Sequence, residues 1–528
     1  MTAIYYFYRF KTLLIFTTVS SIKQHFWIIF LAVFNFALHI TFYNTLGFFR
    51  DELLYFSLGQ HLSAGYASVP PFTGFLAWLI IHTFGYGLFG VRLLPALLSA
   101  IYLILASAIT RELKGGFFAQ VLAVIAVIVM PLNLRGFSMF QPVPWDFFFW
   151  TLLFYFVLRW INTGKERYII FIGIIAGIGM MNKYLIALEI FCIGFVFLFY
   201  SYRVIYTKKS FYYALLLALI ILLPNILWQI KNNLPVLVHM HALHDSQLVH
   251  VNRFDILTDQ FFIGSMSTIL IIPGIIFILI SRKMAPYRPL VIASLLVVVA
   301  LIILRGKSYY TAGLFSFWIA GGAVYWEKTL RLVKSRLILI LIMVLITLPL
   351  VPMGIPVFKP DKLASYFAWM KNNLGLGMTL RWEEGRYHSL PQDYADQLGW
   401  DELTEKTATA YDSIEDKRSV MIYGENYGQA GAIMVIGKRY GLPEPTCFSE
   451  SFFYWVPRRL DREVNTLIYI NDELGDDVRR LFSDIHVAGG IENPLAREYG
   501  TTIWVCQKPV SSFKDFWEQR VPQVKSPF

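Results

Sequence analysis

Carboxylates stand beside long apolar stretches of this 528-residue chain, where ionised groups are costly. Asp51 and Glu52 follow the first apolar stretch, and Asp146 opens a later one. A carboxylate held near a membrane surface can act as a general base toward a hydroxyl or an amine. Adjacent residues on a helix point in different directions, so one member of the Asp51–Glu52 pair can face a cavity while the other orients a substrate or a cation. Alternatively, the pair begins a helix and complements its dipole.

A second group of side chains is basic or phenolic. Lys307, Tyr309 and Tyr310 lie together in the segment RGKSYYTAG, and Lys183 lies in a very short turn between two apolar stretches. With Arg92, they could bind a lipid phosphate. Lys and Tyr are also enriched at membrane interfaces as anchors, and this alternative stays open for the group.

Four histidines share the polar segment 231–257, and His-x-His spacing on a strand can bind a metal. Such a segment is more often simply polar, so we assign no metal ligand and leave a divalent cation open. The segment GENYG resembles a phosphate-binding turn only weakly, because it lacks the Lys-Ser/Thr ending of a P-loop, and we interpret it as structural. The histidines are His239, His241, His244 and His250.

The composition indicates which elements position these groups. Hydrophobic residues make up 56% of the chain and charged residues only 15%, and the mean hydropathy is +0.54. Soluble domains carry about 25% charged residues, so the chain is predicted to be a polytopic α-helical membrane protein. Disordered, coiled-coil and disulfide-stapled secreted proteins are excluded.

Eleven apolar stretches are predicted to span the membrane, and a total of about 11–13 spans is expected. The first run is too long for a signal peptide and lacks a cleavage site. Residues 1–20 are expected to be interfacial, and residues 72–84, which follow a Pro-Pro turn, to form an interfacial or re-entrant helix. The eleven stretches are 25–45, 88–111, 117–133, 145–162, 167–181, 184–201, 210–230, 258–281, 287–304, 309–326 and 335–353.

The distribution of Lys and Arg predicts the orientation. One set of connections carries 18 Lys and Arg and the opposite set carries eight. The positive-inside rule therefore predicts a cytoplasmic N-terminus and an extracytoplasmic C-terminal part. Every candidate site residue then lies on the outer side. The net charge of +11 follows mostly from this topology, so no nucleic-acid partner is expected.

The composition changes near residue 354, which predicts a membrane domain over 1–353 and a soluble extracytoplasmic α/β domain over 354–528. Val420–Pro443 has the pattern of a strand, a turn, a helix and a Gly stop, and 466–472 and 501–507 have that of strands. Cys447 and Cys506 could form a disulfide or remain buried thiols.

Several segments, taken in order, resemble a known family. Phe49–Ala100 looks like the first extracytoplasmic loop of the GT-C glycosyltransferases related to protein O-mannosyltransferases and the lipid A aminoarabinose transferase. QPVPWDFFFW, MNKYLIAL, LLPNILWQIKNNLP and GKSYYTAGLFSFWIAGGA are similar to the bacterial dolichyl-phosphate-mannose-protein mannosyltransferase group. The C-terminal ENYGQAGAI and YGLPEP are similar to its bacterial members. The resemblance covers most of residues 40–330.

The resemblance implies an inverting transfer of a sugar from a polyprenyl-phosphate donor to a glycolipid or protein acceptor, outside the bacterial inner membrane. By that resemblance, Asp51 matches the catalytic acid, with Glu52 beside it, and Asp146 matches a second acidic position. The arginine that opens the next span is Arg92, and Lys307 with Tyr310 matches the phosphate-contacting segment.

One departure from the pattern concerns the residues before Pro70. The aminoarabinose-transferase branch commonly has Glu-Lys there, whereas this chain has Ser68-Val69. A phosphate contact or metal ligand from this point, and that branch's donor sugar, are therefore in doubt.

Two other functions are considered. The first alternative is a transporter or flippase of lipid-linked saccharides, but such proteins usually show inverted repeats with broken helices near the midplane. The second is a membrane scaffold that displays the C-terminal domain. It would not account for the ionisable groups at the edges of the spans.

Overall fold

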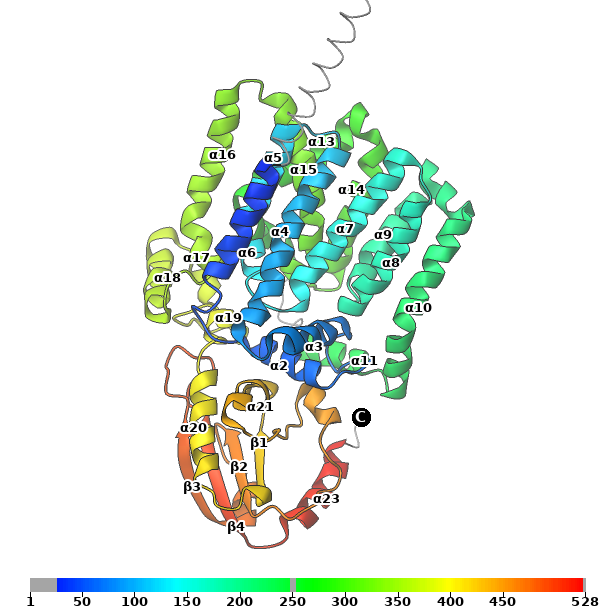
Figure 1. The fold of residues 1–528 in the computed structure, drawn as a ribbon. Coiled ribbons are helices and arrows are strands. Elements are labelled where there is room, and N and C mark those ends of the chain that lie inside the picture. Colours follow the sequence, from blue (N-terminus) through cyan, green and yellow to red (C-terminus); the bar gives the residue numbers. More distant parts are fainter. Residues whose placement is uncertain (1–25, 247–252, 526–528) are drawn as a thin grey trace, which may run out of the picture.

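A computed structural model describes residues 26–246 and 253–525. The interfacial segment expected over residues 1–20, and His250, lie outside the described residues. A bundle of long helices forms one part, and a small α/β domain adjoins one end of it (Figure 1). We call this the outer end of the bundle, by its contact with the C-terminal domain.

A helix lies at each of the eleven predicted spans in the described part of the chain. The helices are Phe26–Thr41, α4 (Leu88–Glu112), α5 (Phe117–Ile128), α7 (Pro142–Thr163), α8 (Arg167–Asn182), α9 (Ile186–Phe197), α10 (Lys209–Lys231), α12 with α13 (Asp255–Gly264, Thr268–Ile280), α14 (Arg288–Ile303), α15 (Ala312–Thr329) and α16 (Val333–Thr347). By length and composition, five described helices can cross a membrane, or six if α9 and the 3₁₀ segment Ser201–Thr207, bent by 110°, form one span.

Helix α15 lies inside the bundle, so it need not be as apolar as a helix that lipid surrounds. Its residues 312–324 are all buried, so its surface meets protein rather than lipid. A Cβ on Gly322 would lie 1.9 Å from the Leu270 carbonyl oxygen, and one on Gly274 would lie 2.1 Å from that of Trp318. Small residues thus let α13 and α15 approach closely, as is common between membrane helices.

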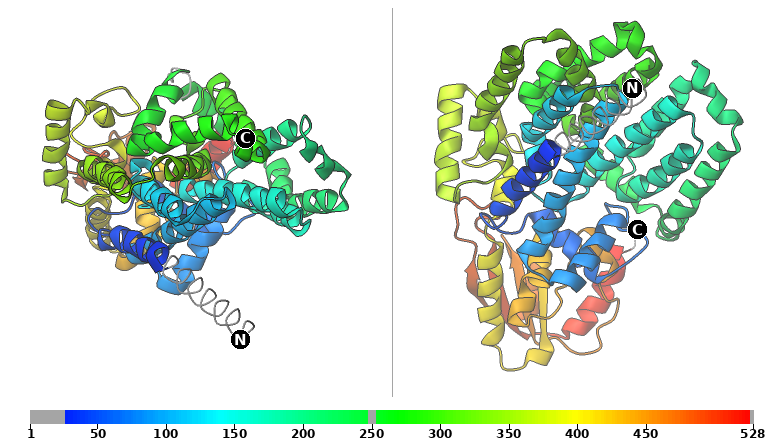
Figure 2. Two further views of the ribbon diagram at one scale, coloured as in Figure 1. Left: turned by 90° about the horizontal axis from the view of Figure 1, so that it is seen from above. Right: turned by 45° about the horizontal axis from the view of Figure 1, so that its top comes forward.

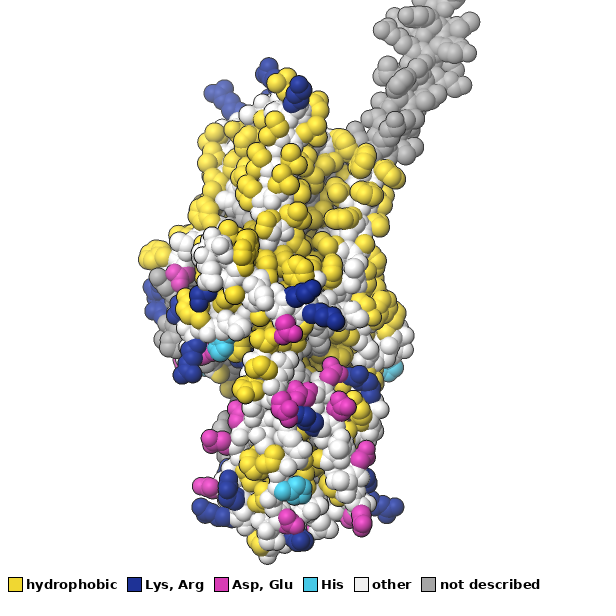
Figure 3. Space-filling model, turned by 90° about the vertical axis from the view of Figure 1, so that its left-hand side faces the viewer, with side chains coloured by type: hydrophobic (Ala, Val, Ile, Leu, Met, Phe, Trp, Pro, Cys, Tyr) yellow, Lys and Arg dark blue, Asp and Glu magenta, His cyan; other side chains and the backbone are white. Residues whose placement is uncertain are grey.

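The sides of the bundle, between its two ends, are apolar. Figure 3 shows hydrophobic side chains over its side, Lys and Arg at the end away from the C-terminal domain, and mixed charges on that domain. Seen from above, α8–α10 extend to one side (Figure 2). On α10, large side chains such as Leu216, Ile220 and Leu227 are exposed, as expected for a face that meets lipid.

Two short helices lie across the outer end of the bundle (Figure 1). They are α2 (Arg50–Gln60) and α3 (Phe72–Phe84), and α3 begins after Pro71 at the predicted turn. With 13 residues, α3 is too short to span a bilayer upright. The shorter helices α6 (Pro131–Gly136), α11 (Pro235–Ser246) and α17 (Val351–Gly354) complete this part.

The C-terminal domain is built on a four-stranded mixed sheet. Strands β1 (Val420–Gly424) and β2 (Thr466–Asn471) are parallel, and β4 (Thr502–Pro509) is antiparallel to β2 and to β3 (Phe482–Gly490). The order is β1-β2-β4-β3, with a bulge between Val487 and Gly489. The predicted strands over 466–472 and 501–507 and the strand-and-helix pattern of 420–443 are confirmed.

Alternating side chains of the sheet pack on two sides. Ile468 faces α20 (Trp400–Asp412) and α21 (Tyr427–Val435), and Leu467 and Tyr469 face α23 (Phe513–Lys525). The apolar core on the α20 and α21 side of the sheet continues into α2 and α3. The C-terminal domain and the outer end of the bundle therefore share buried apolar contacts. The remaining helices are α18 (Pro360–Leu374), α19 (Gln392–Ala395) and α22 (Asp476–Leu481).

Two open questions from the sequence concern the C-terminal domain. Cys447 and Cys506 are buried free thiols, so the disulfide is absent. In the GENYG segment, the Asn426 side chain caps α21 by accepting from the backbone N–H groups of Gly428 and Gln429, so the segment forms the start of that helix.

Candidate functional site

A cavity of about 470 Å³ lies where the outer end of the bundle meets the C-terminal domain. We call it the junction cavity. Its charged and phenolic groups come from seven separate segments of the chain. They are Arg50, Asp51, Arg135, Lys307, Tyr309, Glu383, Asp393, Asp396, Tyr427 and Arg497.

Asp51 presents a carboxylate to the junction cavity from the first turn of α2. The Tyr427 hydroxyl donates a hydrogen bond of 2.9 Å to its Oδ1 atom. Among the described residues, no group donates to Oδ2. Burial raises the pKa of Asp51, and the Tyr427 hydrogen bond, Arg50 and Arg497 oppose this rise. A carboxylate whose pKa is raised is a stronger base than an exposed one.

Lys307 and Tyr309 line the same cavity, from the connection between α14 and α15. The Lys307 Nζ atom lies 3.4 Å from Glu383 Oε1. Tyr309 packs edge-to-face on Tyr310, with ring centroids 4.8 Å apart. The predicted acid Asp51 and the predicted cation Lys307 therefore share one cavity.

Two further ion pairs line the cavity. Arg135 Nη2 lies 2.6 Å from Asp393 Oδ1, and Arg497 Nη1 lies 2.9 Å from Asp396 Oδ2. Burial raises the pKa of Asp396 to about 7, although Arg497 and Arg50 oppose this rise. The cations of the junction cavity are thus paired with carboxylates. An anionic group that enters the cavity must compete with these carboxylates for the cations.

Asp146, Lys183 and Tyr310 lie behind Tyr309 and do not line the junction cavity. The Lys183 Nζ atom is 4.3 Å from the ring centroid of Tyr310 and 5.2 Å from that of Tyr309. Trp150 donates a hydrogen bond of 3.0 Å to Asp146 Oδ1. Electrostatic interactions link Lys183 to Asp146 and Tyr309 to both Asp51 and Asp146. These groups form a second layer next to the cavity.

Glu52 and Arg92 are not brought into the cavity, which corrects our prediction of a catalytic and a phosphate-binding role. Glu52 is fully buried and accepts from Arg92 at 2.9 Å and from the backbone N–H groups of Phe49 and Phe140 at 2.9 and 2.7 Å. Arg92 also donates to backbone carbonyls. Because Glu52 is one residue further along the helix, it points away from the face that carries Asp51. The pair fastens α2 to α4.

The histidine segment is mostly helical rather than a loop or strand. His239, His241 and His244 lie on α11, where residues two apart do not share a face. Within residues 26–246 and 253–525, no three His, Cys, Asp or Glu side chains are placed to hold a metal ion.

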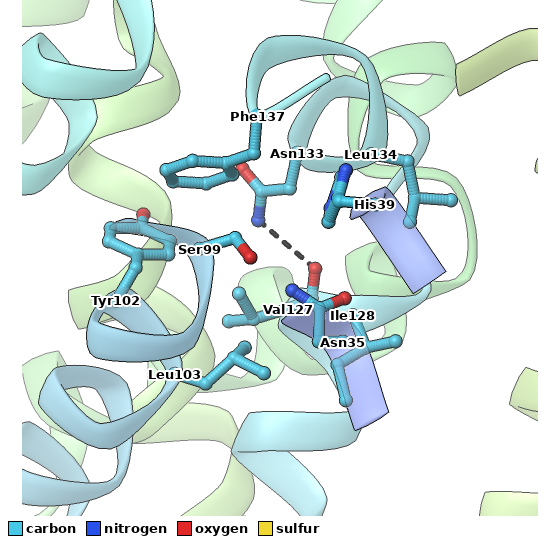
Figure 4. Close-up of a pocket in the computed structure, with 10 residues that line it drawn as sticks. All are labelled: Asn35, His39, Ser99, Tyr102, Leu103, Val127, Ile128, Asn133, Leu134 and Phe137. Atoms are coloured by element: carbon cyan, nitrogen blue, oxygen red, sulfur yellow. Dashed lines mark hydrogen bonds between the residues drawn. The ribbon is translucent and has the colours of Figure 1, made fainter. Parts of the chain in front are cut away.

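A second, smaller polar cavity lies inside the bundle (Figure 4), and α6 contributes residues to it as well as to the junction cavity. It measures about 10 Å³, enough for about one water molecule. Asn133 Nδ2 donates to the Val127 carbonyl at 3.1 Å, while Asn35 Oδ1, His39 Nδ1 and Asn133 Oδ1 have no hydrogen-bond partner among the described residues. Its size excludes a sugar.

Comparisons with known proteins agree with this architecture. Residues 68–228 match the model of the family described as dolichyl-phosphate-mannose-protein mannosyltransferase. No curated protein matches the sequence significantly. Two structures of ArnT from Cupriavidus metallidurans, one bound to undecaprenyl phosphate and one in the apo state, are similar in fold. Their TM-scores are 0.57 and 0.52, at 13% and 12% sequence identity, over 91% and 92% of this chain and 98% of theirs.

The fold is that of the GT-C glycosyltransferases. The predicted resemblance is thereby confirmed. The family match includes Asp146 and Lys183, but it begins after Asp51 and ends before Lys307.

Several residues of the junction cavity were not predicted from the sequence. Arg135 was not singled out as a candidate, and Glu383, Asp393, Asp396 and Arg497 lie in the C-terminal part, where no local pattern marks them. Tyr427 was within reach of prediction, because its segment ENYGQAGAI was part of the resemblance.

Proposed function

We propose that this chain is an inverting glycosyltransferase that moves a sugar from a polyprenyl-phosphate donor to a glycolipid or protein acceptor. The observation that carries the proposal is the position of Asp51 and Lys307 on one cavity at the outer end of an apolar bundle. The match to the mannosyltransferase family and the ArnT fold support it, and that ArnT structure is bound to undecaprenyl phosphate.

In the proposed reaction, Asp51 takes the proton of an acceptor hydroxyl or amine as the acceptor attacks the anomeric carbon. The bond between that carbon and the phosphate oxygen breaks, and the lipid phosphate leaves with the electron pair. Lys307 and Tyr309 lie where a cation and a phenol can stabilise the charge that develops on the phosphate. Lys183, stacked on Tyr310, adds positive charge behind them. Asp146, which interacts with Lys183, holds this layer in place.

The proposal places the chain in a bacterial inner membrane, with the N-terminus in the cytoplasm and the junction cavity outside. The surplus of Lys and Arg in the opposite connections supports this orientation. Residues 1–353 would form the membrane domain and residues 354–528 the extracytoplasmic domain. The lipid tail of the donor would remain in the bilayer beside the bundle.

Mass spectrometry of cell-envelope glycolipids and glycoproteins tests the proposal. Cells with the wild-type gene, without it, and with the Asp51→Asn allele are compared. We expect one glycosylated species to disappear in the last two strains and its polyprenyl-phosphate sugar to accumulate. Identical envelopes in all three strains would contradict the proposal. Loss of the donor from the outer leaflet, without any missing glycosidic bond downstream, would indicate a flippase instead.

A further inference from the structure

Helix α21 of the C-terminal domain lies directly against α2 (Figure 1). Two glycines of α21 make this approach possible. A Cβ on Gly431 would lie 2.8 Å from Leu53 Cβ, and a Cβ on Gly428 would lie 2.9 Å from Arg50 Cγ. A larger side chain at Gly431 would meet the Cβ and backbone of Leu53 and push the two helices apart.

The first turn of α21 is fixed by its cap. Asn426 Oδ1 accepts from the N–H groups of Gly428 and Gln429 at 2.9 and 3.1 Å, and Gln429 Oε1 accepts from the Asn426 N–H at 3.2 Å. This capping box defines where the first helical residue, Tyr427, is placed. Asn426 also donates to Glu498 Oε2 at 3.0 Å, which holds the cap within the domain.

Tyr427 reaches across the interface into the junction cavity. Its hydroxyl donates to Asp51 Oδ1 at 2.9 Å, and the Arg50 guanidinium lies 4.4 Å from its ring centroid. The hydrogen bond engages one oxygen of Asp51 and leaves Oδ2 available to a group in the cavity. The cation over the ring limits the positions that the phenol can adopt.

We propose that Tyr427 is a positioning residue for Asp51, so that the C-terminal domain is a working part of the site. This inference rests on the proposed function, in which Asp51 is the base. A donated hydrogen bond stabilises the ionised carboxylate and fixes its orientation toward the acceptor. Tyr427 itself does not exchange a proton with the substrate.

Other charged and titratable groups also face Asp51 and contribute to its electrostatic environment. Tyr427 differs from these groups because it donates a hydrogen bond to Asp51. The others come from α2, the Lys307–Thr311 connection, the segment before α19, the residue after α19, the 3₁₀ turn Glu450–Tyr454 and the segment before β4. They are Arg50, Tyr55, Tyr309, Glu383, Asp396, Glu450 and Arg497.

The test uses Tyr427→Phe in the full-length chain in lipid nanodiscs, with Tyr469→Phe as the matched control. Tyr469 donates a hydrogen bond of the same 2.9 Å length to a carboxylate, Glu425 Oε2, away from the junction cavity. The ionisation of Asp51 is followed by infrared spectroscopy of ¹³C-labelled aspartate and assigned by its loss in Asp51→Asn. This readout does not require turnover.

We expect Tyr427→Phe to move the titration of Asp51 to higher pH, because the bond that favours its ionised form is lost. The acidic limb of kcat/KM should move the same way, and kcat/KM should fall roughly 10-fold or more. Tyr469→Phe should change neither. An unchanged Asp51 titration in Tyr427→Phe would overturn the inference even if wild-type transfer is observed. A shifted titration in a chain with no transfer activity would support the contact and contradict the proposed function.

Gly431→Ala provides a second variant that keeps the phenol. Alanine normally stabilises a helix relative to glycine, but here its Cβ would meet Leu53. We expect it to separate α21 from α2 and to move the Asp51 titration in the same direction as Tyr427→Phe. A titration identical to wild type would contradict the role of this interface.

Discussion

The Lys307 ammonium lies 3.4 Å from the carboxylate of Glu383, so a cation of the bundle is paired with an acid of the C-terminal part. Both groups line the junction cavity and are partly exposed, and the pair is therefore open to exchange. In the proposed reaction, the donor phosphate would replace Glu383 as the partner of Lys307.

Lys307→Ala should raise the KM for the polyprenyl-phosphate sugar by roughly 10-fold or more, because a charge-assisted contact to the phosphate is lost. Lys508→Ala is the matched control, since Lys508 pairs with Asp484 at 2.9 Å on the sheet away from the cavity. Steady-state kinetics with varied donor measure the effect. An unchanged KM in Lys307→Ala would remove this residue from the donor site.

The pH dependence of kcat/KM should report Asp51. Burial raises the pKa of this carboxyl, and a base works only when it is ionised. Activity should therefore rise with pH through a limb that lies above the ordinary pKa of an aspartate, scanned between about pH 4 and pH 8.

Asp396 and Glu450, whose pKa values are each raised to about 7 by burial, could produce a similar limb. The residual activity of Asp51→Asn separates them. We expect that activity to lack the limb. The same limb in Asp51→Asn would assign it to another group.

Arg92→Met should destabilise the fold without changing the donor site. Breaking a buried ion pair by removing one partner costs about 3–5 kcal/mol, because Glu52 would be left buried and unpaired. Thermal unfolding in detergent measures the loss, and donor KM is measured below the transition. An elevated donor KM with normal stability would instead restore the phosphate-binding role predicted from the sequence.

Lys183→Met tests the layer behind Tyr309. The ammonium of Lys183 stacks on Tyr310 and lies near Tyr309, so its removal should raise the donor KM by roughly 2- to 30-fold. Lys183→Arg keeps a cation that can stack on the same rings and should behave nearly like wild type. Equal loss in both variants would indicate that packing rather than charge matters at this position.

Much of the fold could be predicted from the sequence because apolar length and periodicity are local signals. They located the eleven bundle helices, the short helix α3 and the strands β1, β2 and β4. Strand β3 was not predicted, since only one of its nine residues is buried and its sequence, FSDIHVAGG, lacks a clear alternation.

The site was predicted in part. Asp51, Lys307 and Tyr309 share a cavity because topology places the ends of their segments on one side. Glu52 and Arg92 could not be told from site residues, since a buried pair and a ligand-binding pair have the same composition. The contact between Asp51 and Tyr427 joins positions 376 residues apart, and no local pattern encodes it.

The central claim is that Asp51 activates an acceptor for attack on a lipid-linked sugar. Its most direct test is sugar transfer by the purified full-length chain in nanodiscs, with polyprenyl-phosphate sugars and envelope lipid or protein acceptors. Mass spectrometry detects the product for wild type and Asp51→Asn. The account predicts a new glycosidic bond with wild type and a loss of at least about 100-fold in Asp51→Asn. Equal product formation by both proteins would contradict it.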